Sequence, residues 1–468
     1  MPPKKTAAEA VRSGANGKPA PPLSAGEGGG ARFTNVRLTP ELPGLSDPAG
    51  VAPATAEFKI YGVDLCVVNA LRRSIMADVR TAAIPFNPTQ SAGGGDNGIV
   101  FHKNTSVLHN EFLGHRISLV PIAFDERQLK GFDAAARTFV IKVKNAGEEL
   151  LNVTTGDIKV LDVTGAALPE EERESLFPAS RVTGDHVLLV RLKPSPTRDG
   201  EGEALHVECK ARLGCGREHS RWSPVSACYF GNMIDDAAFE ATLAAKLDRK
   251  KLDDNASDAS EASDASDAAA VRTQHAAMDG KRAFVKNAYG EPSAFDFTLR
   301  TETRIRPAYV VLEGFGRLID KVRRLADGVR AAAAADAAAA AGKDDDDDGW
   351  GGAPAAQTAS GAAVADVRVR PLANMDDFYE VVVQGEDHTL GNLVQGLLYR
   401  HWVREGASAV VSFVGYHQPH PLEDHIVVKL KCAKPGDDVC ARLAEGLDWV
   451  RAELQALSAL FEAAQKGT

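Results

Sequence analysis

The chain has 468 residues, which at about 150 residues per domain corresponds to roughly three globular units. Hydrophobic residues make up 44% and charged residues 25%, close to the globular average, so a wholly disordered chain is excluded. The formal charge is −10, from 54 Lys and Arg against 64 Asp and Glu, and 11 of the acids fall within 253–267 and 344–348. The remainder is near neutral, which gives no support for nucleic-acid binding through one broad basic face.

Cysteine usage and the N-terminal segment favour an intracellular protein. The six cysteines form no CxxC pair, which suits a reducing compartment and gives no disulfide framework. The first residues, MPPKKTAAEAVRSG, are followed by Pro, Gly and Ala rather than by the apolar core of a signal peptide. No run of about 18 apolar residues occurs, so we expect neither secretion nor a membrane span.

Three stretches lack hydrophobic periodicity and are predicted to be flexible. They are a disordered tail at 1–31, an acidic Ser/Ala/Asp spacer at 231–280 whose bias is strongest from about 245, and an Ala/Asp/Gly linker at 331–365. We interpret the two internal stretches as solvated spacers. Phosphorylation of the spacer serines and cation binding by the Asp run of the linker stay open as alternatives.

A pattern of strand, turn and helix occurs twice. Residues 58–62 alternate like a strand and lead into apolar residues at helical spacing, Leu65, Val68, Leu71, Ile75, Met76 and Val79. Residues 378–384 lead into a second such stripe, Leu390, Leu393, Val394, Leu397 and Leu398. A shift of 323 positions places Ile60 on Val383, Gly62 on Gly385, Asp64 on Asp387, Asn69 on Asn392 and Leu71 on Val394. One unit is therefore predicted to be used twice.

Each half ends in a predicted helix with a narrow apolar stripe of alternating four- and three-residue spacing. The stripes are Val311, Phe315, Leu318, Val322, Leu325 and Val329, and Leu443, Leu447, Val450, Leu454, Leu457 and Phe461. A period of about 3.5 residues is typical of a helix that packs on another helix, so the two stripes can cover each other. We infer an intramolecular pseudo-dimer. The alternative is that each stripe packs only on its own sheet.

Residues 128–230 have the short alternating apolar runs of β-strands and fit an inserted, mostly β module. The predicted fold class is therefore α+β. The first unit comprises 32–127 and 281–330, interrupted by this insert, and the second comprises 366–468.

The motif search finds no catalytic centre and no cofactor site. There is no Gly-rich loop ending in GK[ST] and no GxSxG elbow. The segment HQPHPLEDH groups metal-ligand types, but its two prolines prevent a helix that would align them. Cys209, Cys215 and His219 lack the CxxC pair and the fourth ligand of a closed zinc site. We predict no metal.

Two groups of polar residues are candidates for binding. Arg72 falls within the apolar arc between Val68 and Met76, where a guanidinium needs a partner, so it either locks the fold internally or marks a surface that another subunit covers. Glu111, His115 and Arg116 would lie within one or two turns of a helix, as a binding patch or as an ordinary solvated face.

Several segments resemble the α-like assembly subunits of multisubunit DNA-directed RNA polymerases. NALRRSIMADV, NTSVLHNEFLGHRISLVPI, ARLGCGREHSRWSPV and GEPSAFDFTLR are similar to the third-largest subunit of eukaryotic RNA polymerase II, the archaeal D polypeptide and, more distantly, bacterial alpha. VVVQGEDHTLGNLVQGLL and VSFVGYHQPHPLEDHIVVKL are similar to the eleventh subunit and the archaeal L polypeptide. The resemblance covers about 32–330 and 366–465.

The resemblance implies two dimerisation domains and a non-catalytic subunit that nucleates assembly on the largest and second-largest polymerase subunits. Other small subunits would also be partners, and DNA would be reached only through the complex. The residues that would face or support the second-largest subunit are Asn69, Arg72, Arg73, Glu111, His115, Arg116, His219, Trp222 and Pro224. Asp387, His388, Thr389, Leu390 and Asn392 would shape the matching helix start, beside the dimerisation stripes Val311, Phe315, Leu318, Val322, Leu447, Val450, Leu454 and Leu457.

The chain departs from the family pattern in two ways. The cysteines that bind zinc or an iron–sulfur cluster in some members are absent, in agreement with the prediction of no metal. The two partners are fused through a linker of roughly 35 residues, which resembles the single-chain form of some large DNA viruses and gives an effective concentration near the millimolar range. The compartment would be the nucleus, or for a viral chain the host cytoplasm or nucleus and the virion. The alternative function is a free-standing dimerisation scaffold or transcription regulator.

Overall fold

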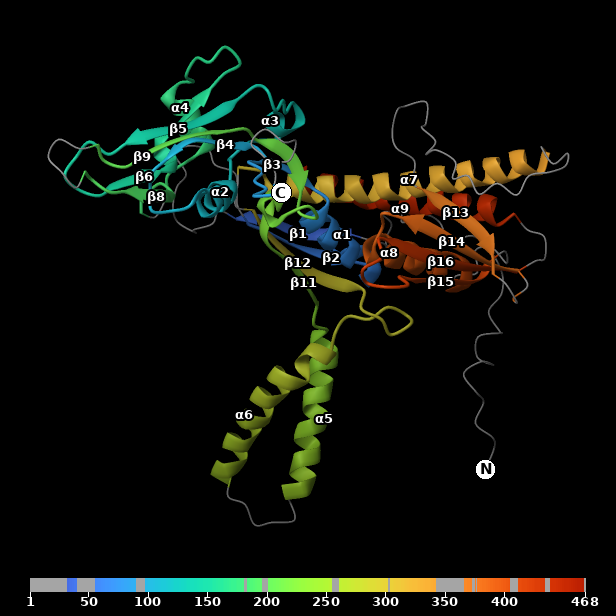
Figure 1. Cartoon of the computed structure of the whole chain (residues 1–468). Helices are drawn as coiled ribbons and strands as arrows, with labels where there is room; N and C mark the ends of the chain where they lie inside the picture. The colour runs from blue at the N-terminus through green and yellow to red at the C-terminus, as the bar shows by residue number, and fades with distance from the viewer. Residues whose placement is uncertain are drawn as a thin grey trace, which may run out of the picture.

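A computed structural model describes residues 32–39, 55–89, 97–180, 183–195, 201–254, 261–301, 304–341, 366–372, 375, 377–404, 411–433 and 438–466. Figure 1 shows two sheet-containing units along one long helix, a β-rich module at one end and a helical hairpin that projects from the body. The expected tail at 1–31 and residues 342–365 of the expected linker lie outside the described residues. Within the described part of the chain, no helix is long and apolar enough to cross a bilayer.

The first unit is a four-stranded antiparallel sheet. In spatial order its strands are β1 (Arg32–Thr39), β2 (Thr55–Tyr61), β12 (Ala294–Thr301) and β11 (Val225–Asn232). In β2 the alternating side chains of Ala56, Phe58 and Ile60 are buried, as a period of two predicts for a sheet with one covered face. Helix α1 (Leu65–Ala77) follows β2 directly.

The second unit repeats this arrangement. Its sheet has the order β13 (Val367–Pro371), β14 (Phe378–Gln384), β16 (His425–Cys432) and β15 (Val411–His417), and α8 (His388–Leu398) follows β14 and continues into the π-helical turn η5 (Tyr399–Arg404). Gly62 and Gly385, which the shift of 323 superimposes, both have φ of 69°. Only glycine adopts that angle without a steric cost, so the same turn leads each strand into its helix.

Two long helices, α7 (Pro307–Ala341) and α9 (Val439–Lys466), pack against each other. Each also contacts a strand of the other unit, α7 with β13 and α9 with β1. The rings of Phe58 in β2 and Phe461 in α9 meet edge to face with centroids 5.2 Å apart. The stripe residues named above are buried, including Phe315, Leu318, Leu447 and Leu454.

The β-rich module comprises a four-stranded and a two-stranded sheet. The orders are β4 (Ile99–Asn104), β9 (Ala204–Cys209), β5 (Thr138–Lys144), β7 (Ile158–Leu161), and β6 (Leu151–Thr154) with β8 (Leu188–Leu192). Short helical segments connect them: α2 (Asn110–Ser118), α3 (Glu126–Lys130), η2 (Thr155–Asp157) and α4 (Glu170–Leu176).

The module differs from the predicted insert at both ends. Strand β4, assigned by sequence to the first unit, pairs with β9, whereas β11 pairs with β12 of the first sheet. Strand β10 (Arg212–Cys215) pairs with β3 (Arg80–Ala83) and leads to the 3-10 turn η3 (Ser220–Trp222). The sequence has the alternating apolar pattern of strands on both sides of each boundary. Only the long-range pairing of strands therefore decides to which sheet each strand belongs.

The predicted spacer at 231–280 is not irregular. Helices α5 (Asp236–Asp254) and α6 (Glu261–Met278) form the projecting hairpin of Figure 1, followed by η4 (Gly280–Arg282). The buried ring of His275 lies 4.8 Å from that of Phe239, and Lys246 forms an ion pair with Asp279. The segment is rich in alanine, which has the highest helix propensity. It therefore forms helices without apolar periodicity when a few contacts hold them together. For the same reason α7 continues to Ala341, past the expected linker start at 331.

Candidate functional site

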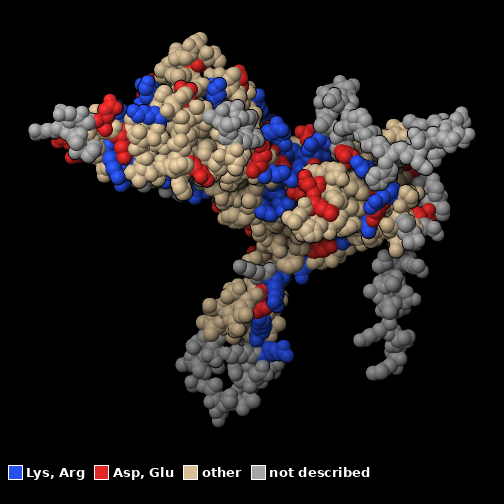
Figure 2. Space-filling view, viewed as in Figure 1, with Lys and Arg blue, Asp and Glu red and all other residues tan. Residues whose placement is uncertain are grey.

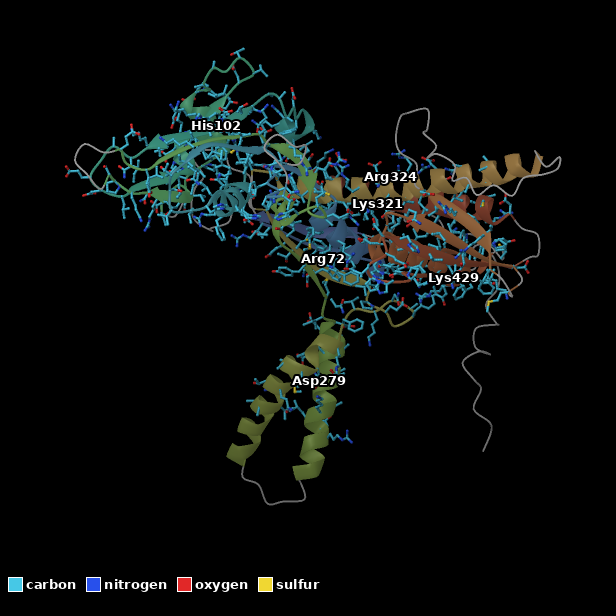
Figure 3. The ribbon with its side chains drawn as sticks, viewed as in Figure 1. Arg72, His102, Asp279, Lys321, Arg324 and Lys429 are labelled. Atoms are coloured by element: carbon cyan, nitrogen blue, oxygen red, sulfur yellow. The ribbon has the colours of Figure 1, made fainter. Side chains whose placement is uncertain are left out.

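One face of α1 is left uncovered and carries an arginine between apolar side chains. Leu65, Asn69, Arg72 and Met76 follow one another at intervals of four, three and four residues, and we call them the α1 stripe. Leu65 and Met76 are 45% and 41% exposed. Arg72 donates to Asn69 Oδ1 from Nε at 3.2 Å and from Nη2 at 3.1 Å. Its position is labelled in Figure 3.

The predicted apolar arc of this helix was wrong by part of a turn. The side chains that α1 buries are Val67, Val68, Ala70, Leu71, Ser74 and Ile75. Helix α1 packs closely on α7 and α8, and each of these helices has a glycine at the contact. A Cβ added at Gly314 of α7 would lie 2.8 Å from Ile75, and one at Gly396 of α8 would lie 2.6 Å from Cys66 Sγ. Arg72 is therefore partly exposed, and no carboxylate pairs with it among the described residues.

Helix α2 presents a second mixed surface. Glu111, His115 and Arg116 do lie on one short helix, and all three are exposed. Arg116 donates to the carbonyl oxygens of Leu189, at 2.9 Å, and Leu188, at 2.7 Å, which ties α2 to β8. Phe112 and Leu119 are 66% and 57% exposed. Large apolar side chains beside charged ones on a surface are typical of a protein interface.

Two of the predicted interface residues in the segment after β10 are buried and pack against the rest of the fold. Trp222 is 3% exposed and Pro224 is buried, so these two predicted interface residues do not face solvent. The Trp222 ring fills the space above Gly214, and Arg212 lies over it with its guanidinium carbon 4.3 Å from the centroid. Arg221 donates to the carbonyl oxygens of Ile84 and Phe86, both at 3.2 Å.

Of the three residues predicted in this segment, His219 is the exposed one, and it lies near His115 of the α2 surface. Its Nδ1 accepts from the backbone N–H of Arg221 at 3.1 Å. Burial and the neighbouring Arg221 and His115 lower its pKa. Figure 2 shows Lys and Arg interspersed with Asp and Glu on this side of the molecule, with both signs gathered where the two units meet.

Arg73, predicted to face or support another subunit, also joins the two units. Its Nε donates to Thr389 Oγ1 at 2.8 Å, and its Nη2 lies 3.3 Å from Asp387 Oδ2. Arg217 lies 3.1 Å from the same carboxylate. Burial alone would raise the pKa of Asp387, but hydrogen bonds from Thr389 and the charges of Arg217 and Lys321 outweigh it and lower the pKa to about 2.

A buried ion cluster lies next to this contact. Lys321 of α7 is 6% exposed, and its Nζ lies 2.8 Å from Glu386 and 3.6 Å from Asp78. Figure 3 places Lys321 and Arg324 on the same stretch of α7, and Arg324 also reaches Glu386, at 3.9 Å. A lysine buried at this depth needs its carboxylates, so the cluster specifies how α7 sits on the second unit.

The two units are joined by a second ion pair that mirrors the pair of Arg73 with Asp387. Arg400, in the turn η5 that follows α8, lies 2.6 Å from Asp64, the residue that precedes α1, just as Arg73 of α1 reaches Asp387, the residue that precedes α8. Arg400 also lies 3.5 Å from Glu453 of α9, which is 2% exposed. Of the other residues predicted at this helix start, Leu390 is buried, Asn392 is half-buried, and the exposed His388 lies 3.3 Å from the Tyr416 hydroxyl.

The two metal candidates of the sequence do not assemble in the described structure. His420 is exposed and its Nδ1 accepts from the backbone of Leu422, while His425 lies 3.6 Å from Glu423. Cys209 is buried in β9, where desolvation raises the pKa of its thiol to about 12. A thiol that stays protonated is a poor metal ligand.

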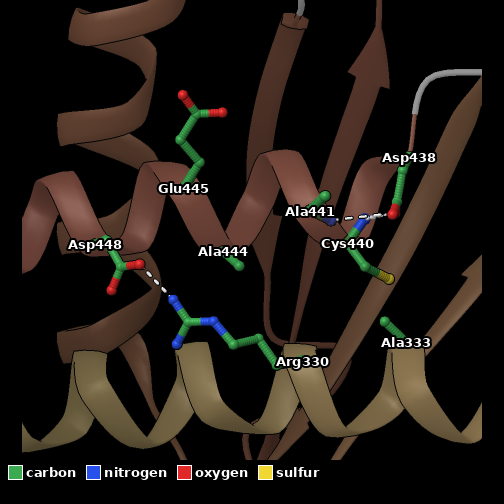
Figure 4. Close-up of a pocket in the computed structure, with 8 residues that line it drawn as sticks. All are labelled: Arg330, Ala333, Asp438, Cys440, Ala441, Ala444, Glu445 and Asp448. Carbon is green, nitrogen blue, oxygen red and sulfur yellow. Dashed lines mark hydrogen bonds and ion pairs between the residues drawn. The ribbon is translucent and has the colours of Figure 1, made fainter.

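A cavity of about 510 Å³ opens beside the paired helices α7 and α9 (Figure 4). Arg330 forms an ion pair with Asp448 on its wall, and Asp438 Oδ1 accepts from the backbone N–H of Cys440 at 3.0 Å. The other lining residues are Ala333, Ala441, Ala444 and Glu445. The lining offers no arrangement of nucleophile, base and oxyanion donors.

Sequence comparison identifies the repeated unit. Residues 57–322, more than half of the chain, and residues 379–459 each match the RNA polymerase Rpb3/Rpb11 dimerisation domain. The chain belongs to this family. The two matched ranges each contain one of the strand, turn and helix units of this fold. Together they include α1, α8, and the apolar stripes of α7 up to Val322 and of α9 up to Leu457.

Relatives of the Rpb3/Rpb11 family come from several kingdoms. The chain is 28% identical over 184 residues to DNA-directed RNA polymerases I and III subunit rpac1 of Dictyostelium discoideum, covering 36% of this chain and 46% of the relative. It is 26% identical to DNA-directed RNA polymerases II, IV and V subunit 3 of Arabidopsis thaliana, covering 42% and 60%. It is 23% identical to DNA-directed RNA polymerase subunit Rpo3 of Aeropyrum pernix, covering 58% and 91%. The chain spans about half of the length of the first two relatives, from Dictyostelium and Arabidopsis.

Proposed function

We propose that this chain is a non-catalytic subunit of a multisubunit DNA-directed RNA polymerase and forms the platform on which the two large catalytic subunits assemble. The observation that carries the proposal is the presence of two Rpb3/Rpb11 dimerisation domains in one chain, with relatives named as polymerase subunits.

The two domains act as an intramolecular pseudo-dimer in this proposal. The first unit takes the part of an Rpb3-like subunit and the second that of an Rpb11-like subunit. Support comes from the contact of α7 with α9, the exchanged contacts with β13 and β1, and the reciprocal pairs Arg73–Asp387 and Arg400–Asp64. The proposed domains follow the sheets: 97–209 as the insert, 32–39 and 55–89 with 212–232 and 283–330 as the first unit, and 366–466 as the second.

The docking surface of the proposal combines the α1 stripe with the exposed side of α2 and His219. Arg72 is its centre, because its guanidinium is held by Asn69 in a fixed position and is partly exposed between Leu65 and Met76. Arginine is one of the residue types that are enriched at interface hot spots. Trp222 and Pro224 support this surface from beneath.

Capture of the large subunits tests the proposal. The tagged chain is purified from its native source in moderate salt, and recovery of the two largest polymerase subunits at equal stoichiometry is expected. Arg72→Ala should lower that recovery at least tenfold, since truncating a hot-spot residue costs roughly 2 kcal/mol or more. Arg368→Ala, which removes a 72% exposed side chain on edge strand β13, serves as the matched control and should leave recovery unchanged.

The alternative, a free-standing dimerisation scaffold or transcription regulator, predicts a different result. The chain would then be recovered alone or with unrelated proteins, and Arg72→Ala would change nothing. Unchanged thermal unfolding of Arg72→Ala separates loss of docking from loss of folding. The compartment in the proposal is that of the polymerase: the nucleus, or for a viral chain the host cell and the virion.

A further inference from the structure

Two histidines and a glutamate meet on the outer face of the β-rich module. His102 belongs to β4, and His206 and Glu208 belong to β9. His102 Nε2 lies 3.3 Å from Glu208 Oε1, and His206 Nε2 lies 3.8 Å from the same oxygen. The two imidazole centroids are 4.6 Å apart. His102 is labelled in Figure 3, within the module and far from the contact between the two units.

The geometry of strands β4 and β9 explains why these three side chains lie close together. His206 and Glu208 are two positions apart on β9, so they share a face, while Val207 between them points inward and is fully buried. The pairing of β4 with β9 shifts register between Phe101 and Lys103, which leaves His102 as the extra residue of a β-bulge. A bulge re-aims one side chain of its strand, and here it turns His102 onto the face of His206 and Glu208.

The three side chains offer what a divalent transition metal requires. One ligand atom from each lies within 4.8 Å of the others, and this is the one set of three or more potential ligands so placed in the described part of the chain. Imidazole nitrogens and a carboxylate are zinc ligands, and imidazole disfavours the oxygen-seeking Mg²⁺. Their side chains are 40%, 29% and 44% exposed, so an ion can enter from solvent.

The surrounding charge sets an upper limit on affinity. Lys103 of β4 and Lys142 of β5 are the register partners of His206, and both are exposed. Their ammonium groups oppose the ion, whereas Glu208 is the one carboxylate paired with both imidazoles among the residues that the structure describes. Long lysine side chains extend into solvent, where salt screens them, so we expect a site of moderate rather than picomolar affinity.

We propose that His102, His206 and Glu208 bind one Zn²⁺ or a similar divalent transition metal, with the remaining coordination position open to water. The ion would cross-link β4 to β9 at the strand that leads into α2, so it would stiffen the module next to the α2 surface. The proposal does not depend on the assembly function. Neither metal candidate of the sequence includes these residues, because β4 and β9 are about a hundred positions apart.

Zinc titration of the full chain tests the site. Isothermal titration calorimetry with ZnCl₂ should give one equivalent of binding that His206→Gln and Glu208→Gln each weaken more than about tenfold, since even indirect ligand partners contribute that much. His425→Gln is the matched control, because that histidine also lies beside one glutamate, Glu423, but has no second imidazole. It should bind like the unmodified chain. Cobalt should bind at the same site with an absorption spectrum that His206→Gln abolishes.

Thermal unfolding gives an independent measurement. Zinc in excess should raise the melting temperature of the unmodified chain and of His425→Gln, but not of His206→Gln, and magnesium should raise none of them. All variants change side chains that are partly exposed, and equal melting temperatures without metal show that they fold. The proposal is overturned if the unmodified chain binds no zinc. It is equally overturned if His206→Gln binds zinc as tightly as the unmodified chain, as it would if thiols such as Cys215 held the ion.

Discussion

At the scale of single residues, Asp387 both begins a helix and joins the two units. Its Oδ1 accepts from the backbone N–H of Thr389 at 2.8 Å, which caps α8, while Oδ2 faces Arg73 and Arg217. A carboxylate at a helix N-terminus is stabilised by the unpaired N–H groups there as well as by its cationic partners. The same group therefore couples local helix formation to the contact between units.

Replacing Asp387 with Asn tests this coupling. The amide can still cap α8 but loses the charge that faces Arg73 and Arg217, so we expect a loss of on the order of 1–3 kcal/mol in the free energy of unfolding at pH 7. The pKa of Asp387 is lowered from 3.8 to about 2, so its stabilisation is complete above pH 4 and disappears as the pH falls toward 2. The difference between the two proteins should shrink over that window.

Urea unfolding at several pH values measures this difference. Asp320→Asn is the control, because Asp320 is 50% exposed and pairs only with Arg323 of its own helix, and such pairs contribute less than about 1 kcal/mol. An Asp387→Asn protein as stable as the unmodified chain at pH 7 would contradict the role given to this carboxylate, as would a difference that does not shrink between pH 4 and pH 2.

The sequence was informative about which residues matter and less so about where they point. Asp387 and Thr389 were placed at the start of a helix, and they are there. Arg73 and Trp222 were predicted to face or support another subunit, and in the structure one bonds across the units and the other is buried. Helical periodicity counts apolar residues, so it could not foresee that Ala70 and Ser74 would take the buried side of α1 and leave Met76 exposed.

At the scale of elements, the repeated unit was predictable and the hairpin was not. Alternation in β2 and β14, the glycine turn and the apolar stripes are local signals, and both sheets have the expected strands. Helices α5 and α6 have no such stripe in the sequence, and a few contacts around His275 hold them together. Boundaries of the β-rich module depended on pairings such as β4 with β9, which no local pattern reveals.

The hairpin of α5 and α6 should be dispensable for folding. At its base, the backbone N–H of Asp235 donates to the carbonyl of Ala283 at 2.9 Å, and Ile234 bridges Phe284. This is the register of a two-residue β-hairpin, so Asn-Gly can replace residues 236–282 with a type I′ turn. We expect the melting temperature of the shortened chain to change by no more than about 4 °C, the effect of roughly 1 kcal/mol.

Differential scanning calorimetry measures the effect of this replacement. Aggregation, or a large fall in melting temperature, would mean that the hairpin stabilises the body. The control replaces 236–282 with Ala-Val, because β-branched residues disfavour the positive φ of that turn and should destabilise the base. Capture of large subunits by the shortened chain would in addition separate the hairpin from the proposed docking surface.

At the scale of the whole molecule, the two units are held by three kinds of contact. The apolar stripes of α7 and α9 are buried against each other, Lys321 is buried with Glu386 and Asp78, and the pairs Arg73–Asp387 and Arg400–Asp64 link the helix starts. These contacts do not need a covalent connection, so we expect them to hold the two units together when the chain is cut within 342–365.

Cutting that segment tests whether the interface is sufficient. With a protease site placed within 342–365, the cleaved halves should co-elute in size-exclusion chromatography at micromolar concentration. Their melting temperature should depend on protein concentration, as it does for any two-chain complex, whereas that of the uncut chain should not. Leu454→Ala removes a fully buried α9 side chain and should cost about 2–5 kcal/mol, enough to dissociate the cleaved halves while the uncut chain remains folded. Separation of the cleaved halves without that substitution would show that the linker, and not the packing of α7 on α9, keeps the units together.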